Sequence, residues 1–271
     1  MSHAAVSQVI VRELSTEAPL VWLKKGWADF TQAPLIGLAH GAAVDLFGLV
    51  LLLVAYDEFW LLAGAFTGFL ALAPVVAVGL YAVSRALERG DPVGFGLVFR
   101  TWWSWRGHPR HDWRLVCFGL LLCLSGTGWV LTSAAFITLL SPVPINQPLD
   151  FLKYIVLARD NHIFEWWWLL GVTLAAPVYA STVVTIPLLL DRKIPVWPAV
   201  LISWRVVLQN PIPLAVWAVT LAVSSMLGIL AMAGSVLVIP VLGHASWHVY
   251  RDSVDASALP PREAAREAGT S

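Results

Sequence analysis

Residues 213–250 read PLAVWAVTLAVSSMLGILAMAGSVLVIPVLGHASWHVY, 38 positions without an Asp, Glu, Lys or Arg. As one helix this segment would be about 57 Å long, nearly twice the roughly 30 Å thickness of a bilayer's hydrocarbon core. The small residues within 232–235 offer a place for the chain to turn. The segment therefore predicts two membrane-spanning helices of about 18 residues each, joined near 232–235.

The composition of the whole chain also indicates a membrane protein. Of the 271 residues, 58% are hydrophobic and 13% are charged, and the mean hydropathy is +0.74. Soluble domains are about half apolar and a quarter charged, so these values exclude a soluble enzyme and a disordered scaffold. The two cysteines, Cys117 and Cys123, lie in one apolar run, and we interpret them as buried apolar side chains. A zinc finger and a disulfide framework are therefore excluded.

Four more apolar runs lie before residues 213–250 in the chain. They cover residues 34–56, 59–84, 115–140 and 166–190. Each is long enough to cross the hydrocarbon core as a helix. The sequence therefore predicts an all-α, polytopic membrane bundle of six transmembrane helices in three hairpins, forming a single membrane domain over residues 1–252.

The distribution of basic residues predicts the orientation of this bundle. With six spans, both termini and the segments 85–114 and 191–212 lie on one side, and of the 17 Lys and Arg residues only Lys153 and Arg159 lie on the other. Treating 213–250 as one span weakens this asymmetry. By the positive-inside rule, the side that carries most of the Lys and Arg residues is cytoplasmic. We expect a bacterial inner-membrane protein with both termini cytoplasmic, no signal peptide and a disordered tail over 253–271.

A Trp followed seven residues later by a Pro occurs before each predicted hairpin. The three copies are Trp27…Pro34, Trp102…Pro109 and Trp204…Pro211. They predict three pseudo-repeats, about 14–90, 91–191 and 192–252, each opened by an elbow helix that lies on the cytoplasmic surface among anionic lipid headgroups. The alternative is coincidence, because Trp and Pro are common near membrane interfaces.

Asp45 is the ionisable residue deepest in a predicted span, eleven residues into the first one. Charged groups at such depth are costly and frequently functional. One interpretation is a proton or cation site. The other is a protonated or hydrogen-bonded carboxyl that locks two helices together.

Three histidines form a second candidate group. His40 and His244 each lie six residues inside a predicted span, which predicts equal depth below the cytoplasmic face, and His248 shares a helix face with His244. Such imidazoles can ligate a metal or haem. The alternative is hydrogen bonding to headgroups or helix ends. Because no acid, Cys or Met completes a ligand set, the sequence predicts no metal and no cofactor.

The segment 100–114 mixes tryptophans with arginines, a pattern also found in proteins that bind single-stranded nucleic acid. On the cytoplasmic face of a membrane, anionic lipid is the better partner. We therefore predict no nucleic-acid binding. The sequence also lacks a phosphate-binding loop and any zinc-protease or serine-hydrolase motif, which favours a protein that is not an enzyme.

The run LGHASWHVYR at residues 242–251 resembles the C-terminal signature of a family of predicted bacterial integral membrane proteins, domain of unknown function 2189. Further similar features are Trp27, Ala73-Pro74, Gly79-Leu80-Tyr81 and Ser84-Arg85, and the similarity covers roughly residues 9–252. The resemblance implies a polytopic inner-membrane protein and assigns no activity. Some relatives carry a cytochrome oxidase subunit label, but this chain lacks the many histidines of a catalytic oxidase subunit.

Three functional hypotheses follow. The first is a non-catalytic protein that packs against or helps to assemble a larger membrane complex, such as a respiratory one. The second is a small-solute or ion transporter or channel that uses Asp45. The third is a haem- or metal-binding redox protein that uses His40, His244 and His248.

Overall fold

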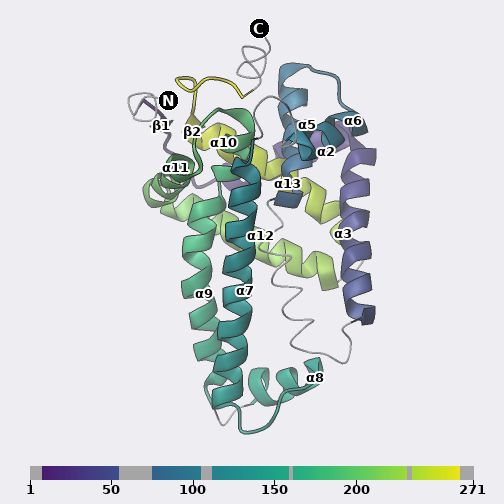
Figure 1. Cartoon of the computed structure of the whole chain (residues 1–271), viewed down its shortest axis with the longest axis vertical. Helices are drawn as coiled ribbons and strands as arrows, with labels where there is room; N and C mark the ends of the chain where they lie inside the picture. The colour runs from purple at the N-terminus through teal and green to yellow at the C-terminus, as the bar shows by residue number, and fades with distance from the viewer. Residues whose placement is uncertain (1–7, 55–74, 105–111, 159–160, 231–233, 263–271) are drawn as a thin grey trace. The chain divides into compact units, whose positions relative to one another are not determined.

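The computed structural model describes residues 8–54, 75–104, 112–158, 161–230 and 234–262 (Figure 1). These residues form helices with one two-stranded sheet. By their contacts they divide into two compact units, and the single membrane domain over residues 1–252 stays a prediction. The first unit comprises residues 1–45, 74–118 and 179–271, and the second comprises residues 46–73 and 119–178.

Four helical segments of the described residues are long and apolar enough to cross a membrane. They are Pro34–Leu51, Arg114–Leu140, Ile163–Asp191 and Pro211–Gly228. These segments agree with four of the six predicted spans. Much of the second predicted span lies outside the described residues. The sixth corresponds to α13 (Ser235–Ser253), which is not among the four because polar residues lower its hydropathy. The six-span count stays a prediction.

The first unit contains most of the shorter helices. Its elements are β1 (Ile10–Val11), α2 (Ala18–Gln32), the start of α3 (Pro34–Val54), α5 (Val78–Arg89), α6 (Phe95–Trp102), the start of α7 (Arg114–Leu140), α10 (Thr185–Asp191), α11 (Val196–Gln209), α12 (Pro211–Leu230), α13 and β2 (Val254–Asp255). Proline begins both α3 and α12, because its fixed φ suits a first helical position and its missing N–H is not needed there.

The three predicted elbow segments are helical, and each is followed by a candidate span. Trp27 lies in α2, Trp102 in α6 and Trp204 in α11. The contacts follow a cyclic order: α5 packs on α6, α10 packs on α11, and α13 packs on α2. The helices α5, α10 and α13 also contact one another. Two of the predicted repeat boundaries, residues 90 and 191, coincide with the ends of α5 and α10.

Glycines let α2 and α3 approach α13 closely. A methyl group on Gly26 would lie 2.6 Å from the Val241 carbonyl oxygen. On α3, a methyl group on Gly41 would lie 2.6 Å from Val236 Cα. Gly37 and Gly41 form a small-xxx-small pattern, which brings membrane helices into backbone contact. The sequence analysis did not identify this pattern.

The chain segments near the two ends pair with each other. Ile10 and Val11 of β1 pair antiparallel with Asp255 and Val254 of β2. The tail predicted to be disordered from residue 253 is ordered through Arg262, because its backbone is hydrogen-bonded to the end of α10. The Arg262 N–H donates to the Asp191 carbonyl at 3.0 Å, and the Lys193 N–H donates to the Pro260 carbonyl at 2.9 Å.

The second unit is built on α7 and α9 (Ile163–Thr182), which lie side by side (Figure 1). They are connected through α8 (Pro148–Phe151) and a π-helical turn, η2 (Leu152–Val156). Trp167 of α9 donates to the Ser133 hydroxyl of α7 at 2.7 Å and packs on Trp129. Its neighbours Trp166 and Trp168 are exposed, as an aromatic belt requires.

The fourth predicted span, residues 166–190, is interrupted. Helix α9 ends at Thr182 and α10 begins at Thr185. Pro187 explains the break, since it has no N–H to donate to the Val183 carbonyl four residues earlier.

Candidate functional site

A line of polar side chains follows one face of α13. His244, His248 and Asp252 are spaced four residues apart, so they share a helix face. Two of them contact α2. His248 Nε2 donates to Asp29 Oδ2 at 2.8 Å, and Asp252 accepts from Lys25 Nζ at 2.8 Å. The elbow helix α2 is therefore held to α13 by a histidine–carboxylate hydrogen bond and a Lys–Asp salt bridge.

His244 lies at the buried end of this line. Its side chain is 0% exposed, and its Nδ1 lies 2.8 Å from the Ser84 hydroxyl of α5. Its Nε2 has no hydrogen-bond partner among the described residues. The interpretation of His244 as a headgroup ligand is wrong, because packing of α13 against α2 and α5 encloses it.

Asp45 contacts the beginning of α13. The Ser235 hydroxyl donates to Asp45 Oδ1, one turn along α3 from the close approach at Gly41. This geometry is the helix-to-helix hydrogen bond that was the second interpretation of Asp45. A proton or cation role for Asp45 stays a prediction.

His40 bonds within its own helix. Its Nδ1 donates to the Ile36 carbonyl at 2.8 Å, so in a neutral ring Nε2 is the acceptor nitrogen. That nitrogen faces Gly79 of α5, where a methyl group would lie only 2.7 Å away. His40 and His248 both lie within electrostatic reach of His244. Within the described part of the chain, no three His, Cys, Asp or Glu side chains converge as metal ligands would.

A second polar cluster joins α5, α10 and α13, and the sequence analysis missed it. The buried Asp191 accepts hydrogen bonds from the Tyr250 hydroxyl at 2.9 Å, from Arg89 at 3.0 Å and from Arg192 at 2.9 Å. Glu88 accepts similarly from Trp247 Nε1 and from Arg251. In the sequence, the positions of Asp191 and Glu88 next to arginines and near predicted helix ends were the features that could have indicated this cluster.

An ion-pair cluster connects the start of α7 to the C-terminal segment. Asp112 binds Arg114 at 2.7 Å and Arg262 at 3.0 Å. Burial opposes ionisation of the carboxyl, but the hydrogen bonds and charges of the two arginines outweigh it and lower the pKa of Asp112 to about 2. Arg114 also donates to the carbonyls of Arg192 and Ile194, so this cluster fixes the 191–194 connection.

The four candidate spans are typical of a membrane protein, and the comparison with known families agrees. Residues 61–191 match the family DUF2189, described as a predicted integral membrane protein. The resemblance inferred from the sequence is thereby confirmed. The run at 242–251, the most specific part of that resemblance, lies outside the matched range. No curated protein and no solved structure matches the chain.

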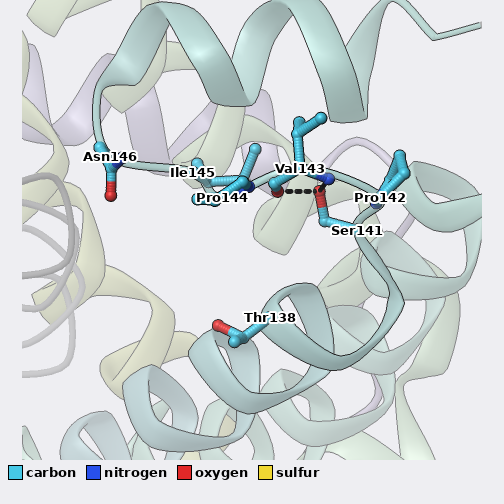
Figure 2. Close-up of a pocket in the computed structure, with 7 residues that line it drawn as sticks. All are labelled: Thr138, Ser141, Pro142, Val143, Pro144, Ile145 and Asn146. Carbon is cyan, nitrogen blue, oxygen red and sulfur yellow. Dashed lines mark hydrogen bonds between the residues drawn. The ribbon is translucent and has the colours of Figure 1, made fainter.

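A hollow within the DUF2189 segment lies at the end of α7 (Figure 2). It is lined by Thr138 and by residues 141–146, where the Ser141 hydroxyl donates to the Val143 carbonyl at 2.7 Å. A second hollow lies along α12, over residues 215–224. No titratable side chain is among those lining either hollow.

The interpretation of both cysteines as buried is wrong. Cys117 is exposed and Cys123 is half-buried. Apolar side chains on a membrane helix face lipid as readily as protein, so an apolar run does not predict burial within the protein.

Proposed function

We propose that this integral membrane protein is a non-catalytic subunit that packs against or helps to assemble a larger membrane complex. The supporting observation is that several of its buried and half-buried ionisable groups bind other groups of the same chain. His248 is paired with Asp29, and Asp191 accepts from Tyr250 and two arginines. Groups used in this way hold helices together and leave broad apolar helix faces for lipid or neighbouring subunits.

The proposal includes an inner-membrane location with both termini cytoplasmic. The pairing of β1 with β2 supports it, because it keeps residues 10–11 beside residues 254–255 on the same side of the bilayer. The salt bridge between Arg12 and Asp255, 3.0 Å long, strengthens this contact. The excess of Lys and Arg on that side supports a cytoplasmic assignment.

Native-membrane purification tests the proposed role. The tagged chain is cross-linked in its own membranes, extracted in mild detergent, and separated by native electrophoresis. We expect it to migrate with the same membrane subunits at fixed stoichiometry with and without cross-linking. A polytopic protein with the same tag and similar expression is the control. Migration as an isolated chain under both conditions would contradict the assembly role.

A second candidate function is transport of protons or cations through Asp45. The observation in its favour is that Asp45, within a candidate span, meets Ser235 of α13. The variant Asp45→Asn separates the two interpretations, since an amide can still accept the serine hydrogen bond but cannot ionise. Loss of ion flux in liposomes with unchanged thermal stability would favour transport. Absence of flux in both proteins would leave the carboxyl as a helix lock.

A further inference from the structure

Each elbow helix carries one exposed basic side chain that has no ion-pair or hydrogen-bond partner among the described residues. These side chains are Lys24 of α2, Arg100 of α6 and Arg205 of α11. None of the three helices carries an exposed acid, since Asp29, the single acid in their sequences, is buried against His248. Within the described part of the chain, each elbow therefore presents a positive charge that no acid compensates.

Exposed apolar side chains surround each of these charges. On α2, Leu20 and Trp27 flank Lys24 at spacings of four and three residues, so all three share a helix face.

The α11 helix repeats this arrangement, since Leu201 and Leu208 flank Arg205 with the same spacings. The α6 helix repeats it in part. The exposed Trp103, directly after α6, is three residues from Arg100, and the exposed Phe99 is adjacent to it in the chain. A cation within an apolar face is the pattern of a helix that lies in a membrane interface.

Most other basic residues of the first unit are already engaged. Their partners are Asp255 for Arg12, Asp252 for Lys25, Asp191 for Arg89 and Arg192, Asp112 for Arg114 and Arg262, and Glu88 for Arg251. In the segment 100–114, for which the sequence predicted lipid contact, Arg106 and Arg110 lie outside the described residues. Arg100 has no partner among the described residues, and Arg114 is bound to protein groups. Among the described basic residues of the first unit, the exposed side chains without an ion-pair or hydrogen-bond partner are thus those of Lys24, Arg100 and Arg205 on the elbow helices and of Lys193 outside them.

We infer that the three elbow helices bind the headgroups of anionic phospholipids through Lys24, Arg100 and Arg205. Two elbows run directly into candidate spans: α2 ends at Gln32 and α3 begins at Pro34, while α11 ends at Gln209 and α12 begins at Pro211. A helix that enters a span lies at the bilayer surface, where phosphates meet the cations and the apolar neighbours reach the acyl chains. This inference requires only the bilayer and is independent of the proposed assembly role.

Lipid titration of the full chain in detergent tests the inference, with bound lipids counted by native mass spectrometry. Phosphatidylglycerol is the probe and phosphatidylcholine is the reference. We expect the wild-type chain to prefer phosphatidylglycerol. The triple variant Lys24→Gln/Arg100→Gln/Arg205→Gln should lose about fivefold in affinity per cation, roughly 100-fold in all.

Two controls separate specific contacts from net charge and misfolding. Arg12→Gln removes a basic residue that is paired with Asp255 and should change the preference little. Lys24→Arg/Arg100→Lys/Arg205→Lys keeps the charges and should retain binding. An unchanged preference in the neutral triple variant would overturn the inference, as would an equal loss in Arg12→Gln. Retained preference with loss of an acidic protein partner would instead identify these helices as a protein interface, and would also overturn it.

Discussion

The close packing of α3 on α13 predicts that Gly41→Ala destabilises the protein. The added methyl group would lie 2.6 Å from Val236 Cα, whereas non-bonded carbon atoms prefer about 3.5 to 4.0 Å. The helices must therefore separate by about 1 Å at this point. Such overpacking costs about 1 to 3 kcal/mol. Separation would also stretch the nearby hydrogen bond from Ser235 to Asp45.

Gly48→Ala is the matched control on the same helix. Among the described residues, no atom lies within 4 Å of the position that its methyl group would take. Both substitutions gain about 1 kcal/mol of helix propensity, so the difference between the two variants isolates the overlap. We expect Gly41→Ala to be less stable than Gly48→Ala by about 1 to 3 kcal/mol.

The assay is unfolding of the purified protein in mixed micelles with increasing denaturing detergent, followed by tryptophan fluorescence. Gly41→Ala should unfold at lower denaturing-detergent content than the wild type, and Gly48→Ala at the same or higher content. Equal midpoints for the two variants would refute the close approach of α3 and α13. A parallel comparison of Gly26→Ala with Gly48→Ala tests the contact of α2 with Val241 and Ala245.

Further predictions concern pH, the buried histidine, topology and redox chemistry. The pKa of Asp112 is about 2 in the folded protein and 3.8 ordinarily. The ionised carboxylate therefore stabilises the folded protein by about 2 kcal/mol above pH 4, and this stabilisation is lost as the pH falls from 4 to 2. The melting temperature of Asp112→Asn should not show this part of the pH dependence. Ser84→Ala should cost about 1 to 3 kcal/mol by leaving His244 Nδ1 unpaired, while the exposed Ser125→Ala should melt like the wild type. A phosphatase fused after Tyr250 should be inactive, since that enzyme folds only in the periplasm; activity would contradict cytoplasmic termini. The purified protein should show no stoichiometric haem or metal, and such a group abolished by His244→Gln would support the redox hypothesis.

The helices were predictable from sequence because spanning a bilayer requires long apolar runs. The run at 213–250 contains α12, described as far as Leu230, and α13, which begins at Ser235. The predicted join near 232–235 lies mostly outside the described residues, so the division into two spans stays a prediction. The prediction of helices at Trp27, Trp102 and Trp204 is confirmed, whereas their placement on the membrane surface stays a prediction. These features depend on the local chain alone.

The contacts between helices were not predictable in the same way. Ser84 and His244 are 160 residues apart in the chain, and Asp45 and Ser235 are 190 apart. Lipid-facing and protein-facing positions are both apolar, so periodicity does not indicate which helices touch. The informative local pattern was Gly37-x3-Gly41. It indicates which face of α3 packs closely against another helix, but not which helix that is.

The packing of α13 against α2 closes the cyclic order of helices within the first unit. A solenoid protein grows by adding repeats to an open end, and its length varies among relatives for that reason. Here α13 occupies the face of α2 that a further helix would need, so this order of packed helices has no open end. The pairing of β1 with β2 brings residues 10–11 beside residues 254–255. We therefore expect a circular permutant that links the ends and opens the chain at Gly90, between α5 and α6, to fold and to keep these helix contacts.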